Sequence, residues 1–181
     1  YPVYCNLETK DYVIHKNKKP FELKHFIEFP SEYESQTYEY LKVSDLFISA
    51  HYWDPSSPKI FTKEQMKEFL KLKIIGDITC DVDGSIPTTI KSTTIEEPNF
   101  FLNTEIFSET KKVDGNLAIM AVDNLPSELP RDSSTEFGNG IVNEVLPYIL
   151  EEDDGRILNS TIAAEGRFLK KYNYLNEYIN S

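Results

Sequence analysis

Three aspartates lie close together in the segment IIGDITCDVDG, at positions 77, 81 and 83. A carboxylate inside or just beyond a buried strand is costly unless it finds a partner. Asp81 could face a ribose, a nicotinamide ring or a substrate ammonium group. Alternatively, Asp81 and Asp83 could cap a turn by accepting bonds from nearby backbone amides. A calcium loop is excluded, because that motif needs glycine at its sixth position and Ile86 occupies it.

Polar and aromatic side chains also follow two other apolar runs. His51 is next to Tyr52–Trp53 and could contact a nucleotide by hydrogen bonding or stacking, or lie half exposed in a loop. Asn124 lies between an apolar run and two prolines, so it either forms a turn or donates to a carboxamide. His15 and His25 fall in a polar segment, where we expect a surface position.

Three short apolar runs must position these side chains. Each run is apolar almost throughout rather than alternating, which is typical of parallel strands covered on both faces. Ligands bind beyond the carboxyl ends of such strands, so the residues that follow them should share one edge. The sequence therefore predicts an α/β fold with a Rossmann-like parallel sheet. The runs are Asp45–Ala50, Lys73–Cys80 and Leu117–Val122.

The segment between the first two runs predicts a crossover helix. Thr62 and Gln65 have the spacing of a capping box, and Met66, Phe69 and Leu70 would line one face. Two parallel strands need such a crossover, and its hand is almost always right.

Further elements are expected on both sides of this βαβ unit. Ser31 with Glu34, and Ser133 with Glu136, have capping-box spacing. The apolar stripe that follows the second box predicts a core-facing helix. We expect a strand at Pro2–Leu7 and helices at Tyr33–Leu41, Ser133–Leu150 and Arg167–Ile179.

Composition limits the classes of function. The net charge of −11 disfavours nucleic-acid binding, and the one basic patch, His15–Lys19, fits a solvated loop. No apolar segment approaches the length of a membrane span, and no signal peptide opens the chain, so we expect a cytoplasmic protein. Cys5 and Cys80 lack a partner pattern and fit reduced thiols; no metal-binding motif is present.

A missing glycine-rich motif bears on the hypothesis that the chain binds a dinucleotide. A dinucleotide fold needs a glycine-rich turn that lets the pyrophosphate approach a helix N-terminus. The chain has only seven glycines and no GxGxxG. Either it binds no dinucleotide, or that half of the site lies upstream of Tyr1; a first residue other than Met fits a fragment.

Two long blocks resemble a known family. IIGDITCDVDGSIPTTIKSTTIEEP and MAVDNLPSELPRDSSTEFG look like blocks of lysine–ketoglutarate reductase, the first half of aminoadipate-semialdehyde synthase. FELKHFIEFPSEYES, HYWDPSSPKIFTKEQ and KKYNYLNEYI also fit, so the similarity spans nearly the whole chain. The wider group includes lysine-forming saccharopine dehydrogenases, alanine dehydrogenase and the transhydrogenase alpha chain.

The resemblance implies two Rossmann-like domains with a cleft between them. Residues 1–129 would form the latter part of the domain that binds NAD or NADP, and residues 130–181 a helical segment returning to the substrate domain. The implied reaction joins lysine and 2-oxoglutarate into saccharopine, or runs in reverse. The catalytic Lys/His pair would lie upstream in the same protein, which could be a homo-oligomer.

The resemblance also implies cofactor contacts after each strand. Ala50 and His51 match contacts near the adenine-side ribose, although alanine dehydrogenase has an aliphatic residue in place of His51. Ile78 and Asp81 match residues beside the nicotinamide, and the matching aspartate of alanine dehydrogenase is implicated in catalysis, so Asp81 is the candidate catalytic residue.

Val122, Asn124 and Leu125 match the segment that closes over the nicotinamide end. Two alternatives stay open: a related amino-acid dehydrogenase with another substrate, such as alanine, and a non-catalytic interaction module that binds no nucleotide.

Overall fold

The computed structural model describes residues 1–69, 71–111 and 117–179. The chain divides into two compact units, Tyr1–Glu128 and Leu129–Ser181. The assignment of residues 1–129 and 130–181 to a nucleotide domain and a substrate domain stays a prediction.

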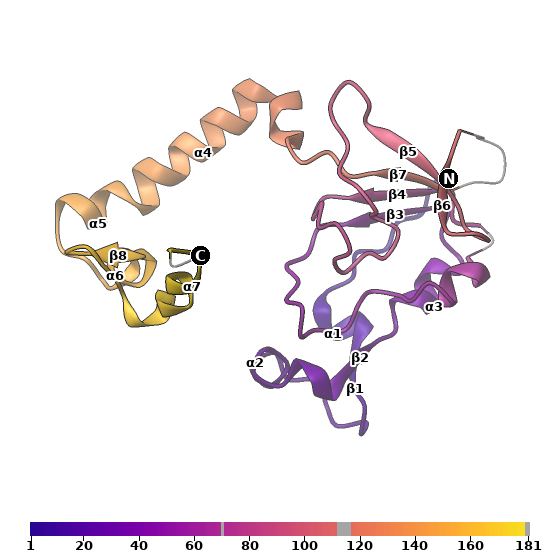
Figure 1. Ribbon diagram of the computed structural model, residues 1–181, viewed down its shortest axis with the longest axis horizontal. Coiled ribbons are helices and arrows are strands. Elements are labelled where there is room, and N and C mark those ends of the chain that lie inside the picture. Colours follow the sequence, from indigo (N-terminus) through magenta and orange to yellow (C-terminus); the bar gives the residue numbers. More distant parts are fainter. Residues whose placement is uncertain (70, 112–116, 180–181) are drawn as a thin grey trace. The chain divides into compact units, whose positions relative to one another are not determined.

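A five-stranded sheet forms the centre of the first unit (Figure 1). Strands β3 (Leu46–Ser49), β4 (Ile74–Asp77) and β7 (Leu117–Met120) are adjacent and parallel, which confirms the predicted parallel α/β arrangement. The hairpin β5 (Asn99–Asn103) and β6 (Ser108–Thr110) was not expected. It adds two strands beyond β7, and β5 pairs with β7 antiparallel, so the sheet is mixed.

The two faces of the sheet differ in burial. Ile75 lies opposite Ile119 in the register, and both are fully buried in the core with Leu102 of the hairpin. The alternate positions point to the other face, where Ile48 is 61% exposed and Ile74 is also exposed. The chain's own core therefore covers one face of these strands, whereas the other face is exposed.

Among its described residues, the connection from β3 to β4 contains one helical element, the short 3₁₀ helix η2 (Gln65–Glu68). The prediction of a longer crossover helix was therefore wrong. The capping box itself is present: the Thr62 amide donates to Gln65 Oε1 at 2.8 Å, and the Gln65 amide donates to Thr62 Oγ1 at 3.2 Å. Met66 and Phe69 are buried in the core, whereas Leu70 lies outside the described residues. One turn is enough to bury these two side chains.

Small elements precede the sheet. Pro2–Leu7 is not a strand, and the expected helix at Tyr33–Leu41 begins as a strand before it turns helical. Tyr33 pairs with His15 in a short antiparallel ribbon, which accounts for the extended backbone there. The elements are α1 (Thr9–Tyr12), β1 (Val13–His15), α2 (Leu23–Glu28), η1 (Pro30–Glu32), β2 (Tyr33–Ser35) and α3 (Thr37–Leu41).

The second unit is mainly helical. Its long helix begins at Pro130 rather than at Ser133, because proline is well tolerated in a first helical turn. Phe137 is 73% exposed, so the apolar stripe is not core within this chain. The final segment is not one helix but a small ribbon followed by helical turns. The elements are α4 (Pro130–Glu144), α5 (Leu146–Leu150), α6 (Arg156–Ser160), β8 (Ala163–Ala164), β9 (Arg167–Phe168), η4 (Lys170–Leu175) and α7 (Asn176–Ile179).

Among the helices of the described residues, none has both the length and the apolar character that crossing a bilayer requires.

Candidate functional site

The carboxyl ends of β3, β4 and β7 meet at one edge of the sheet, as parallel strands require. We call the residues that follow them the carboxyl rim: Ala50–Asp54, Ile78–Asp83 and Val122–Leu125. Hydrogen bonds to backbone carbonyls link its three parts. The Ile78 amide donates to the Ser49 carbonyl at 2.8 Å, and the Cys80 thiol donates to the Val122 carbonyl at 3.2 Å.

Asp77, the last residue of β4, is a structural carboxylate. It is fully buried and accepts three hydrogen bonds. The amide and hydroxyl of Thr79 donate to Oδ1 at 3.0 and 2.6 Å, and the Thr89 hydroxyl donates to Oδ2 at 2.6 Å. These bonds compensate the cost of burial and tie β4 to the loop that follows it.

Asp81 is in a different situation, because it is exposed and, over the described residues, its carboxylate makes no hydrogen bond or ion pair. The turn it belongs to is closed by backbone atoms alone: the Gly84 amide donates to the Asp81 carbonyl at 2.9 Å. A β-carbon added at Gly84 would lie 2.5 Å from the Asp81 β-carbon, so this turn requires glycine. The Asp81 carboxylate therefore does not cap its own loop, and its contact with a ligand stays a prediction.

The two ring nitrogens of His51 differ in their hydrogen bonding. Its Nδ1 lies 2.9 Å from Ser49 Oγ, whereas Nε2 is buried and has no hydrogen-bond partner among the described residues. Burial lowers the pKa of His51 below its ordinary value; the nearby carboxylates of Asp77 and Asp81 oppose that shift only in part. His51 is therefore a neutral imidazole, and its Nε2 has no hydrogen-bond partner among the described residues.

The remaining predicted contacts lie at the same edge. Ala50, Ile78 and Asn124 are exposed, and Leu125 is half buried at the start of the 3₁₀ helix η3 (Leu125–Glu128). Val122 is buried, and its carbonyl accepts a hydrogen bond from the Cys80 thiol. All seven predicted cofactor positions thus lie on the carboxyl rim, although their contacts with a cofactor stay predictions.

Thr93 supports the rim and was missed from the sequence. Its amide donates to the Ala121 carbonyl at 2.8 Å, and its hydroxyl accepts from the Ala121 amide at 3.0 Å. Thr93 also bridges to Val122 in parallel fashion, so the chain just before Asn124 is fixed on both sides. A threonine in a polar loop carries no sequence signal for this role.

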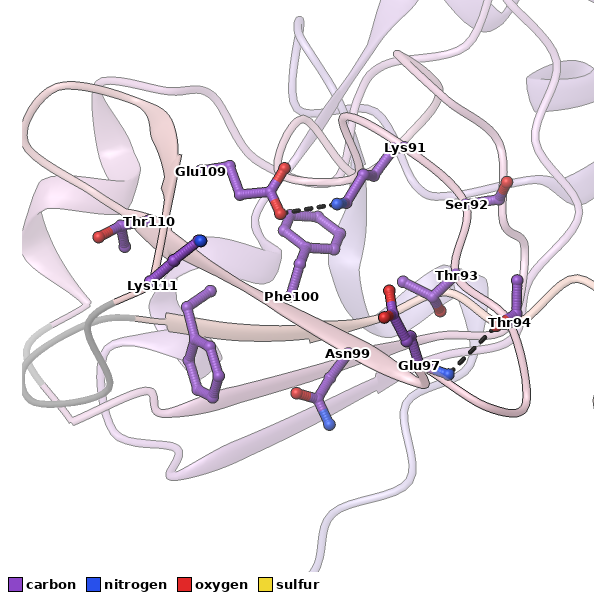
Figure 2. Close-up of a pocket in the computed structure, with 11 residues that line it drawn as sticks. Lys91, Ser92, Thr93, Thr94, Glu97, Asn99, Phe100, Glu109, Thr110 and Lys111 are labelled. Carbon is purple, nitrogen blue, oxygen red and sulfur yellow. Dashed lines mark hydrogen bonds and ion pairs between the residues drawn. The ribbon is translucent and has the colours of Figure 1, made fainter.

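A separate hollow of about 340 Å³ lies between the loop that holds Thr93 and the β5–β6 hairpin (Figure 2). Lys91 pairs with Glu109 across it at 2.7 Å and lies over the Phe100 ring. The hollow is lined by residues of opposite charge that neutralise each other, and none of the predicted cofactor contacts belongs to it.

The rim can hold one end of a planar, polar ligand. It offers an exposed carboxylate and a neutral imidazole. The described residues include no glycine-rich turn at a helix N-terminus, so the pyrophosphate of a dinucleotide would need groups from elsewhere.

Comparison with known proteins gives a consistent result. The family model described as alanine dehydrogenase/PNT, C-terminal domain, matches residues 7–172. An alpha-aminoadipic semialdehyde synthase of Arabidopsis thaliana is 29% identical over 97% of this chain and 18% of its own length. The NAD(+), L-lysine-forming saccharopine dehydrogenase of Schizosaccharomyces pombe is 30% identical over 57% of this chain and 27% of its own.

Alanine dehydrogenase 2 of Staphylococcus aureus is also similar, with 30% identity over 61% of this chain and 26% of its own length. The chain therefore spans only about a fifth to a quarter of the lengths of these relatives.

Proposed function

This chain belongs to the alanine dehydrogenase/PNT C-terminal domain family, whose matched relatives include dehydrogenases, and on that premise we propose that it forms the rim of a nicotinamide site in a larger oxidoreductase. The proposed reaction transfers hydride between NAD(P)H and the imine of lysine and 2-oxoglutarate, giving saccharopine or running in reverse. The names of the Arabidopsis and fission-yeast relatives support this substrate choice.

One observation carries the proposal. An exposed carboxylate, Asp81, and a buried nitrogen without a partner among the described residues, His51 Nε2, lie on the same carboxyl rim. A buried polar atom of this kind costs free energy unless a ligand or water bonds to it. The buried nitrogen therefore fits a polar ligand at the place where open parallel sheets bind nucleotides, beside the exposed carboxylate of Asp81.

We assign roles to the chain's own residues by their place on the rim. Ala50 and His51 would contact the adenine-side ribose, with Nε2 as the bonding atom. Ile78 and Asp81 would lie beside the nicotinamide, where Asp81 holds the ring or a substrate cation. Val122, Asn124 and Leu125 would close over the carboxamide end.

A nicotinamide bound there supplies the hydride, and the protein's part is to orient the ring and exclude water. We propose that the glycine-rich turn, the residue that selects NAD or NADP and the Lys/His acid–base pair are supplied by the additional sequence that the longer relatives carry.

The test uses the full-length protein. It is titrated with NADH and with NADPH while nicotinamide fluorescence is followed, and then assayed for oxidation of the bound nucleotide with lysine plus 2-oxoglutarate. Saturable binding and turnover with this pair are expected. Turnover with pyruvate and ammonia instead would favour an alanine dehydrogenase, and the absence of binding to either nucleotide would favour an interaction module.

A further inference from the structure

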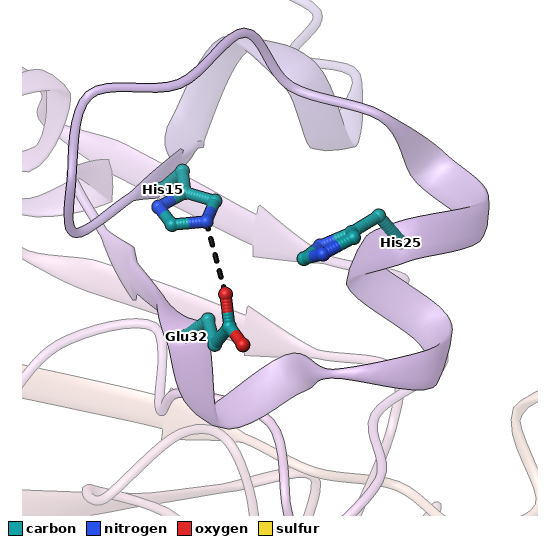
Figure 3. Close-up of side chains that lie close together, drawn as sticks. All are labelled: His15, His25 and Glu32. Atoms are coloured by element: carbon teal, nitrogen blue, oxygen red, sulfur yellow. Dashed lines mark hydrogen bonds and ion pairs between the residues drawn. The ribbon is translucent and has the colours of Figure 1, made fainter.

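A cluster of two histidines and a glutamate lies away from the carboxyl rim, in the small elements that precede the sheet. His15 ends β1, His25 lies in α2 and Glu32 ends η1, and Figure 3 shows the three side chains facing one another. One potential ligand atom from each lies within 4.8 Å of the others. Sequence reasoning expected both histidines on the surface, yet His15 is only 2% exposed.

His15 and Glu32 are already close to the spacing of two ligands on one ion. His15 Nε2 lies 3.1 Å from Glu32 Oε2. Zinc bonds of 2.0–2.2 Å in a tetrahedron place neighbouring ligand atoms about 3.4 Å apart. His25 completes the set from the short helix α2, none of whose residues is buried.

A second layer of contacts orients His25. Its Nδ1 lies 3.0 Å from the Tyr33 hydroxyl, which leaves Nε2 for an ion. Tyr33 is itself buried and packs edge-on against Phe21 and Phe26, with ring centroids 5.9 and 5.2 Å away. Aromatic rings thus form a rigid, apolar wall behind the polar cluster.

The ring of His15 has to change its proton position on binding. The Asn17 amide donates to His15 Nδ1 at 3.0 Å, so the ring proton is on Nε2 and is donated to Glu32. An ion at Nε2 shifts that proton to Nδ1 and breaks the bond from Asn17. This bond and the bond from His15 to Glu32 are lost, and three metal–ligand bonds replace them.

We propose that His15, His25 and Glu32 bind a first-row divalent metal ion such as Zn²⁺, which links β1, α2 and η1. Two imidazoles with one carboxylate suit zinc, cobalt or nickel, whereas magnesium and calcium prefer oxygen ligands alone. Three protein ligands leave a fourth position for water. The ion is independent of the nicotinamide chemistry, because its ligands share no residue with the carboxyl rim.

Cobalt provides the direct test. Full-length protein, stripped with a chelator, is titrated with Co²⁺ while visible absorption is recorded, and then with Zn²⁺ by calorimetry. The wild type should show the absorption bands of a cobalt ion in a nitrogen–oxygen tetrahedron. Their absence from the wild type would overturn the proposal, whatever the variants do.

Variants locate the ion. His25→Gln and Glu32→Gln should each weaken zinc binding at least tenfold, and Tyr33→Phe, which keeps all three ligands, should weaken it about 10- to 100-fold. Glu28→Gln removes an exposed carboxylate from the same helix as His25 and should change nothing. If zinc binds the two ligand variants as tightly as the wild type, the cluster is only a hydrogen-bonded network.

Discussion

Two carboxylates four residues apart have opposite surroundings. Asp77 is buried and accepts three hydrogen bonds, whereas Asp81 is exposed and accepts none among the described residues. Their spacing in the sequence could not separate these roles, because a carboxylate at the end of an apolar run and one directly after it can each bond to the loop or to a ligand. Burial on β4 decides which of them supports the fold and which is available to a ligand.

Asp81→Asn in the full-length protein keeps the shape of the side chain and removes its charge. We expect nicotinamide affinity or turnover to fall at least tenfold, because a charge-assisted contact contributes more than a neutral one. Asp83→Asn makes the same charge change two residues away, at a left-handed backbone position that asparagine tolerates (φ 56°), and should be nearly neutral. Fluorescence titration and steady-state kinetics measure both; equal behaviour of the two variants would remove Asp81 from the site.

His51 should make the protein less stable in mild acid. Because burial lowers its pKa below 6.5 in the folded state, the unfolded chain takes up a proton that the folded chain does not. Stability is therefore lost as the pH falls through about 6.5 toward the folded pKa. In His51→Gln the melting temperature should fall less between about pH 7.5 and 5.5 than in the wild type. If the melting temperatures of the wild type and of His51→Gln fall by the same amount between the two pH values, this assignment is contradicted.

At the scale of elements, the buried hydroxyl of Thr89 ties the loop from Asp81 to Thr89 to β4. Thr89→Val removes the bond to Asp77 Oδ2 and should cost about 1–3 kcal/mol, because a buried carboxylate oxygen loses its donor. Thr88→Val is the matched control, since the Thr88 hydroxyl is buried without a hydrogen bond, and it should be neutral or stabilising. Urea unfolding of both variants decides; a larger loss for Thr88→Val would refute the role of Thr89.

The three parallel strands were predictable, and most of the other elements were not. β3, β4 and β7 follow from short apolar runs of strand length. The β5–β6 hairpin was missed because Asn99–Asn103 mixes polar ends with phenylalanines and has no hairpin turn of the Asn-Gly type. The capping box at Thr62 marked a real turn, but such a box does not determine how far a helix continues.

The site was predictable in position rather than in detail. Parallel strands alone place Ala50, Ile78 and Asn124 at one edge. The free nitrogen of His51 and the burial of His15 depend on packing between distant segments, which local patterns do not contain.

At the scale of the molecule, the open face of the sheet carries Leu46, Ile48 and Ile74 in an exposed apolar group. Runs that are apolar throughout are typical of strands covered on both sides, and the relatives are several times longer than this chain. We expect the additional sequence to cover this face in the full-length protein.

Ile48→Glu in the full-length protein should then cost at least about 2–3 kcal/mol, because it buries an unpaired charge or exposes the face. Ile106→Glu, at an exposed position between β5 and β6, should change stability by less than about 0.5 kcal/mol. Chemical denaturation of the two variants compares them directly. A harmless Ile48→Glu would mean that the face stays in contact with water.

The position of the β5–β6 hairpin in the sequence also affects the order in which the strands of the sheet pair during synthesis. β4 and β7 are neighbours in the sheet, yet the hairpin lies between them in the sequence. For β4 to pair with β7, the long loop between them must first close. Closing it costs chain entropy before any contact between the strands forms, so the pairing is slow. During synthesis, β3 and β4 can pair while β7 is still inside the ribosome, so the edge that holds Asn124 is completed last. Nascent chains should thus acquire nucleotide affinity only after β7 has emerged.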